Sequence, residues 1–146
     1  MNRRAIIFGV KGHLLNKREK ALIKKTKPWG IILFSRNVKN IEQLKKLIWQ
    51  IKKIFNDKKY PILMDVEGGK VSRIDKIIDL KMFSQNFFEK LYIKNKKAFL
   101  IYYKIYVDSV SSILKNVGIN INTVPVLDVI RKKTNNVIGS RSFSSS

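Results

Sequence analysis

The sequence contains no cysteine, which excludes disulfide bonds and any chemistry that depends on a thiolate. Long apolar runs are also missing, since none approaches the ~20 residues that a membrane-spanning helix needs. The first ten residues resemble a signal peptide only superficially: their apolar part is very short, and Lys11 and His13 come directly after it. We therefore interpret this segment as a first strand and expect a cytoplasmic protein that makes no membrane contact.

Acidic residues and histidine are scarce. The 146 residues include 10 acidic side chains, 1 histidine and 31 lysine or arginine side chains, which gives a formal net charge of +21. A charge of this size attracts nucleic acid or an anionic membrane face. However, the basic residues form neither a separate tail nor a single stripe studded with aromatic side chains. We favour a solvated surface with no nucleic-acid partner, and keep a basic nucleic-acid-binding α/β domain as an alternative.

Metal-binding and phosphate-binding motifs are absent as well. No cluster of Asp and His residues has metal-ligand spacing, and no GxxxxGK[ST] loop is present to cradle phosphates. The sequence therefore predicts neither a metal nor a cofactor. His13 lies between the first predicted strand and the first predicted helix with no motif around it, so we interpret it as an ordinary loop or partly buried histidine.

Hydrophobic residues, 45% of the chain, form strand-like runs that alternate with helix-like periods. This content and length fit one modest domain spanning residues 1–146. Strands that alternate with helices pair in parallel through right-handed crossovers, so the predicted fold class is α/β. Four such units fit either a small open sheet or half of an eight-unit barrel. Strands are predicted at Ala5–Val10, Trp29–Phe34, Ile62–Asp65 and Ile119–Asn122, and helices at Asn16–Thr26, after Asn40, and between Ser84 and about Asn116.

The segment Ile138–Phe143 looks like a structured loop at an active face. The sequence then stops after three serines, with no helix to cover the last unit. A parallel sheet whose last strand lacks its helix exposes apolar surface and an open edge. The sequence therefore looks cut, and we expect a longer barrel of which this is a part.

The segment Pro61–Arg73 runs from a short apolar strand into a carboxylate, a double glycine and an arginine. An apolar run of this kind suits a parallel strand that is covered on both faces. Asp65 would then lie at the carboxyl end of that strand, where parallel α/β folds bind their ligands. The alternative is a strand followed by a solvated turn.

Five segments of the chain form a recognisable series: Trp29–Asn37, Glu42–Leu44, Asp65–Arg73, Pro125–Val129 and Ile138–Phe143. In this order they resemble family 3 glycoside hydrolases. The most similar members are the single-domain bacterial β-N-acetylglucosaminidases, which recycle peptidoglycan fragments in the cytoplasm. The resemblance runs through nearly the whole chain, and five motifs in sequence make coincidence improbable.

The resemblance implies a TIM-type barrel and the retaining hydrolysis of terminal β-linked N-acetylglucosamine in a small amino-sugar saccharide. It assigns the binding of sugar hydroxyls to Asp65, and it places Arg73 and Arg141 in the same sugar subsite. The chemistry agrees, because a carboxylate accepts two hydroxyl hydrogen bonds and a guanidinium donates a fixed fork to oxygen atoms. A β-glucosidase of the same family is an alternative, since nothing here assigns recognition of the acetamido group.

The sequence departs from the family pattern in one important respect. Val66 and Lys70 replace residues that the family commonly has, but neither is assigned to the sugar. The Lys-His-Phe-Pro-Gly-His-Gly-like segment that supplies the histidine acid/base has no counterpart before Ser146, and the aspartate nucleophile is expected beyond it too. We therefore expect the first half of a barrel of ~250 residues, about four βα units, with no catalytic residue and no activity of its own. A carbohydrate-binding remnant that dimerises is a further possibility, so the oligomeric state stays open.

Two other carboxylates and a group of aromatic residues have alternative roles. Glu67 is the acidic residue nearest to Asp65 in the sequence, and we expect it to support the site instead of contacting the sugar. Asp128 follows another apolar strand and either faces the same mouth or stabilises a loop. Asn37 ends a strand, and a turn role is expected first. The remaining aromatic residues are predicted to pack between helices and not to stack on bases: Phe87, Phe88, Tyr92, Tyr102, Tyr103 and Tyr106.

Overall fold

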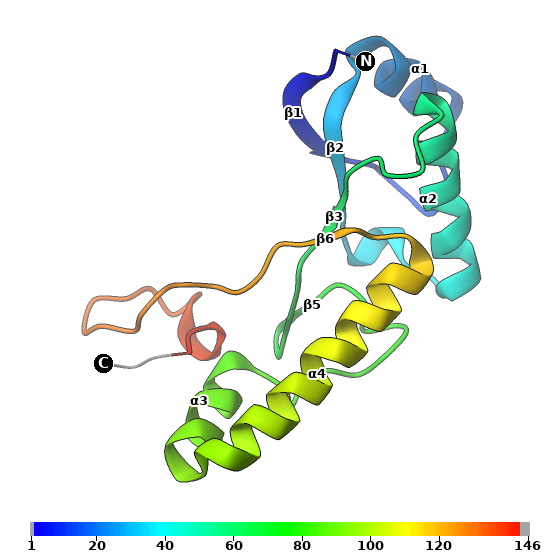
Figure 1. Cartoon of the computed structure of the whole chain (residues 1–146). Coiled ribbons are helices and arrows are strands. Elements are labelled where there is room, and N and C mark those ends of the chain that lie inside the picture. The colour runs from blue at the N-terminus through cyan, green and yellow to red at the C-terminus, as the bar shows by residue number, and fades with distance from the viewer. Residues whose placement is uncertain (1, 144–146) are drawn as a thin grey trace.

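A four-stranded parallel sheet is the centre of the fold in the computed structural model, which describes residues 2–143 (Figure 1). The strand order is β1-β2-β3-β6, and each neighbouring pair is parallel, as the alternation predicts. The strands are β1 (Arg4–Gly9), β2 (Pro28–Leu33), β3 (Ile62–Met64) and β6 (Ile121–Asn122).

Four α-helices connect the strands: α1 (Lys17–Thr26), α2 (Ile41–Phe55), α3 (Gln85–Lys94) and α4 (Lys96–Val117). The helix starts predicted at Asn16, Asn40 and Ser84 are correct. The side chains of Asn16, Asn40 and Ser84 each accept a hydrogen bond from a backbone N–H of the first turn, and Gly118 ends α4 with a positive φ. None of the helices within residues 2–143 combines the length and the apolar character that crossing a membrane requires.

The helical structure predicted between Ser84 and Asn116 is divided at Asn95. This residue has a φ of −157°, and its side chain accepts a hydrogen bond from the backbone N–H of Ala98 at 3.0 Å. An asparagine that bonds its own backbone in this way begins a new helix instead of continuing the old one. The long aromatic segment therefore folds as a helical hairpin, α3 against α4, within which Phe88 is completely buried.

The core lies between the sheet and the helices that cover its outer face. Strands β2 and β3 contribute buried Ile31, Leu33, Ile62 and Met64. Tyr60 stacks on Phe55 with ring centroids 4.3 Å apart, and its hydroxyl donates a hydrogen bond to the Pro28 carbonyl oxygen. Burial raises the pKa of Tyr60 to about 12. The apolar positions of α2 face this core: Leu44, Leu47, Ile48, Ile51 and Phe55 are buried, and Ile41 and Ile54 pack against them.

The first strand is exposed although its sequence is apolar. Ile6 and Ile7 are 44% and 46% exposed, because β1 pairs with β2 on one side only among residues 2–143. The opposite edge strand is β6, which pairs only with β3 in the same part of the chain. The sheet therefore has two open edges within residues 2–143, one at β1 and one at β6.

Asn37 fixes the turn that follows β2. It ends a short 3₁₀ helix (Ser35–Asn37), is completely buried, and accepts a hydrogen bond at Oδ1 from the Phe34 N–H. Its Nδ2 donates to the carbonyl oxygens of Val10 and Gly12 at 3.0 and 2.9 Å. The predicted turn role is correct, and the same side chain ties this turn to the loop after β1.

We expect Asn37→Ala to lower the free energy of unfolding by roughly 2 kcal/mol, because it leaves one buried donor and two acceptors without their partner. Urea unfolding followed by circular dichroism measures the change. Asn136→Ala is the matched control, since Asn136 is exposed, and it should leave stability unchanged. Equal midpoints for the two variants would contradict this account of Asn37.

Candidate functional site

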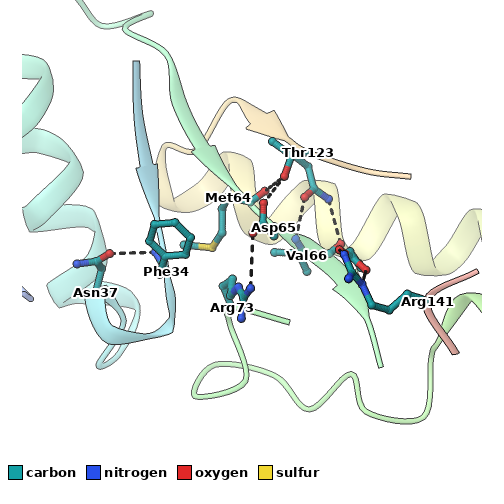
Figure 2. Close-up of polar contacts among 10 residues, drawn as sticks. Phe34, Asn37, Met64, Asp65, Val66, Arg73, Thr123 and Arg141 are labelled. Carbon is teal, nitrogen blue, oxygen red and sulfur yellow. Dashed lines mark hydrogen bonds and ion pairs between the residues drawn. The ribbon is translucent and has the colours of Figure 1, made fainter. Parts of the chain in front are cut away.

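Asp65 and Arg73 meet at the carboxyl end of β3, as the sequence predicts for Asp65 (Figure 2). A carboxylate oxygen of Asp65 lies 3.7 Å from an Nη atom of Arg73, and the Arg73 N–H donates to the Asp65 carbonyl oxygen. The hydroxyl of Thr123, directly after β6, donates to the other carboxylate oxygen of Asp65. Both charged side chains are partly exposed, so they pair while staying accessible from solution.

A small antiparallel hairpin returns the chain from Asp65 to Arg73. Its strands are β4 (Val66–Gly68) and β5 (Val71–Ser72), and the sequence analysis did not predict them. Gly68 and Gly69 have φ values of 85° and 60°, and a Cβ at Gly68 would lie 2.1 Å from the Phe83 carbonyl oxygen. Only glycine fits there, and the double glycine therefore brings the arginine back beside the carboxylate.

Glu67 and Arg141 form a second charged pair. Arg141 lies in a short 3₁₀ helix (Gly139–Arg141), and its Nε and Nη2 donate to the two carboxylate oxygens of Glu67 at 2.9 and 2.8 Å. Glu67 is only 5% exposed. The hydrogen bonds with Glu67 raise the pKa of Arg141, and the nearby carboxylates of Asp128 and Asp65 act in the same direction.

The two pairs together occupy the region where the sequence analysis placed its site residues. Asp65 binds Arg73, and Glu67 binds Arg141, which comes from the far end of the chain. Figure 2 labels Asp65, Arg73 and Arg141 in this region. Among residues 2–143, the carboxylate of Glu67 pairs with Arg141 and not with Arg73. The arrangement offers one accessible carboxylate and two guanidinium groups within a small area.

Two donors beside Asp65 have no acceptor within residues 2–143. They are Arg73 Nε and the Ser72 hydroxyl, and both atoms are buried. A buried donor without a partner costs free energy, so such groups mark places where a ligand or water completes the structure. The unused donor of Arg73 is on the same guanidinium that faces Asp65.

Asp128 lies in an irregular segment. The strand predicted before it is wrong, since β6 ends at Asn122 and residues 123–128 form no ladder. Pro125 within this segment has no N–H to contribute to a sheet. The Asp128 carbonyl oxygen accepts a hydrogen bond from the buried Ser142 hydroxyl at 2.5 Å, so its backbone anchors the loop that carries Arg141.

Asn120 and Asn122 are residues that the sequence analysis missed. The side chain of Asn122 accepts from the Val66 N–H and donates to the Val66 carbonyl oxygen, and Asn120 accepts from the Ile62 N–H. These amides add to the backbone pairing of β3 with β6, and they fix the backbone at Ile62 and Val66, on the two sides of Asp65. The available signal was a pair of asparagines two residues apart on a predicted buried strand.

No catalytic group stands out in the described part of the chain. His13 is exposed in the loop between β1 and α1, as its sequence context predicts. Within residues 2–143 no three His, Cys, Asp or Glu side chains gather in a way that would hold a metal ion.

The sequence profile described as Glycosyl hydrolase family 3 N terminal domain matches residues 8–146. The chain belongs to this family. Among curated family 3 relatives it is 34% identical over 143 residues to a beta-hexosaminidase of Psychromonas ingrahamii and 30% identical over 141 residues to one of Haemophilus influenzae. These alignments cover 98% and 97% of the chain but only 41% and 38% of the two relatives. The chain therefore spans about two fifths of their length.

Solved structures of family 3 enzymes have the same fold. NagZ from Neisseria gonorrhoeae in complex with N-trifluoroacetyl-D-glucosamine is 30% identical, with a TM-score of 0.85 over 97% of this chain and 42% of that one. A family 3 beta-N-acetylglucosaminidase from Paenibacillus is 26% identical, with a TM-score of 0.68, and the match covers 95% of this chain and 26% of that protein. The open sheet is thus the first half of a family 3 barrel, with three complete βα units and a fourth strand within residues 2–143.

Proposed function

We propose that this chain supplies part of the sugar-binding face of a retaining β-N-acetylhexosaminidase, which removes terminal β-linked N-acetylglucosamine. The observation that carries the proposal is the pairing of Asp65 with Arg73 at the carboxyl end of β3. A carboxylate beside a guanidinium offers acceptors and donors to neighbouring hydroxyls of one sugar ring. The Neisseria NagZ structure, a complex with N-trifluoroacetyl-D-glucosamine, supports this choice of sugar.

Each residue has a distinct task in this proposal. Asp65 accepts hydrogen bonds from two hydroxyls of the terminal sugar, while Arg73 donates to a ring substituent through the accessible part of its guanidinium. Arg141 donates through the part of its guanidinium that Glu67 leaves free, and Glu67 fixes the direction of that group. Asp128 supports the Arg141 loop through its backbone.

The proposed setting is taken from the family resemblance. The substrate would be a peptidoglycan fragment, the location would be the cytoplasm, and residues 1–146 would be the amino-terminal portion of a single barrel domain. The chain covers only 41% of the Psychromonas relative, which supports assigning the remaining strands to sequence outside these residues. Retaining hydrolysis needs a nucleophile and an acid/base, and we assign both to that remaining part.

A chimera tests the proposal. It joins residues 1–143 to the part of the Psychromonas beta-hexosaminidase that lies beyond the matched region. We expect the chimera to release 4-nitrophenol from the N-acetyl-β-glucosaminide and not from the β-glucoside, while the 146-residue chain alone releases none from either. Hydrolysis of the glucoside in preference would favour a β-glucosidase. Saturable release by the 146-residue chain itself would contradict the assignment of the catalytic groups.

A further inference from the structure

Six lysines gather around two adjoining hollows beside the carboxyl-terminal parts of α2 and α4. The hollows measure about 490 and 360 Å³ and share Lys52, Lys58, Lys115 and Gly118 along their walls. Their lining residues come mainly from the second half of α2, from the end of α4, which packs against α2, and from the segments that follow the two helices. The six lysines are Lys45, Lys52, Lys53, Lys58, Lys59 and Lys115.

The positive charge here is not balanced by the surrounding structure. Asp57 is the one acidic residue among those that line the hollows within residues 2–143, and its carboxylate is paired with Arg3. Lys45 is balanced by Glu42, since its Nζ atom lies 3.6 Å from the Glu42 Oε1 atom. The carboxyl-terminal ends of α2 and α4 contribute about half a negative charge each. Because Asp57 is neutralised by Arg3, only Glu42 and the two helix ends balance the six lysines, and a surplus of about four positive charges remains.

Lys52 is the most enclosed of these lysines. Its ammonium group donates a hydrogen bond to the Gly118 carbonyl oxygen at 2.8 Å, and it lines both hollows. Burial lowers the pKa of Lys52, and attraction to Asp57 opposes the shift. An anion bound in the hollow would offset the cost of desolvating this ammonium group.

Trp49 adds an aromatic surface at the rim of the larger hollow. Its side chain is 57% exposed, and the Lys53 ammonium lies 4.5 Å from the ring centroid. It is the one aromatic residue among those that line the two hollows within residues 2–143. Proteins that track single-stranded nucleic acid present several aromatic groups along a basic groove. A single indole beside a concentrated cluster of lysines fits a compact anion better.

We propose that these hollows bind a small anion that carries a chain of phosphate groups. Several ammonium groups around one concavity suit a polyphosphate. Each lysine binds phosphate as a point charge on a flexible side chain, and a polyphosphate presents several phosphate groups to these lysines at once. The two sources of such an anion are an inorganic polyphosphate and a nucleoside polyphosphate, whose base would stack on Trp49. The proposal does not depend on the sugar-binding function, since none of the six lysines belongs to the proposed sugar subsite: Lys58 and Lys59 precede β3, whereas Asp65 follows it.

The test uses the 146-residue chain with Trp29→Phe, so that Trp49 alone reports by fluorescence. Inorganic triphosphate and ATP are titrated at low salt. The patch variant K53Q/K58Q/K115Q is compared with K17Q/K20Q/K90Q, which removes the same charge from exposed lysines elsewhere. All six positions are exposed and Lys52 is retained, so both variants should fold; circular dichroism checks this.

We expect the patch variant to bind triphosphate roughly tenfold or more weakly than the parent, and the control variant to stay within about twofold, because each lost charge contact is worth a fraction of a kcal/mol to about one kcal/mol. Tighter binding of ATP than of triphosphate would identify a nucleotide, and equal binding would identify the phosphate chain alone. Equal losses in the two variants, or no binding by the parent, would overturn the proposal. Binding of a 12-nucleotide single strand far more tightly than ATP would also overturn it, in favour of a nucleic-acid surface.

Discussion

Replacing Asp65 with alanine in the chimera should weaken N-acetylglucosamine binding by roughly 100-fold or more, since two hydrogen bonds to a charged group contribute about 1.5–3 kcal/mol each. The loss has a second cause. Without the carboxylate 3.7 Å away, Arg73 is no longer held in place at this end of β3. Isothermal titration calorimetry measures the affinity, and the hydrolysis of the N-acetyl-β-glucosaminide should fall with it.

Two variants make the Asp65 result interpretable. Asp65→Asn keeps the size of the side chain and one acceptor, so its affinity should lie between those of the parent and Asp65→Ala. Asp75→Ala removes an exposed carboxylate from the neighbouring irregular segment and should leave affinity unchanged. An Asp65→Ala chimera that is folded and binds within twofold of the parent would show that this carboxylate does not contact the sugar.

Glu67→Ala should have the largest effect on stability among the charged residues, lowering the free energy of unfolding by roughly 3 kcal/mol. The substitution leaves the Arg141 guanidinium without the carboxylate that accepts two of its hydrogen bonds. Glu67 is 5% exposed, whereas the Arg141 side chain is 26% exposed, so water recovers part of the loss on the arginine side. Urea unfolding of the 146-residue chain measures the change.

The Glu67 prediction also has matched controls. Glu67→Gln retains one acceptor and should lose about half as much stability as Glu67→Ala. Glu42→Ala breaks an exposed pair with Lys45 and should cost well under ~1 kcal/mol. If Glu67→Ala and Glu42→Ala unfold at the same urea concentration, the pairing with Arg141 does not stabilise the fold.

The helices and the parallel sheet were predictable because their signals are local. The apolar positions of α2 recur at helical spacing, and its cap Asn40 precedes them directly, so no distant information is needed. The hairpin of β4 and β5 was not predictable in this way. Its strands have three and two residues, too few for an alternation to be recognised, and only the double glycine marked a turn there.

Only one of the two charged pairs in the candidate site was predictable from the sequence. Asp65 and Arg73 belong to one short segment, so a strand followed by a glycine turn was enough to place them together. The partner of Glu67 was not predicted, because Arg141 is 74 residues further along the chain. Strand alternation places residues two apart, such as Asp65 and Glu67, on the same face of a continuous strand, and it contains no information about which residue a later loop will bring to either of them.

The exposed isoleucines of β1 have a consequence for how copies of this chain behave toward one another. An unpaired strand edge with apolar side chains is a template on which another backbone can align. A charge of +21 keeps two such edges apart while few counterions are present. At physiological ionic strength the repulsion decays over about 8 Å. As the salt concentration rises, charge repulsion therefore no longer keeps the copies apart, and the unpaired edge of β1 becomes a site of self-association.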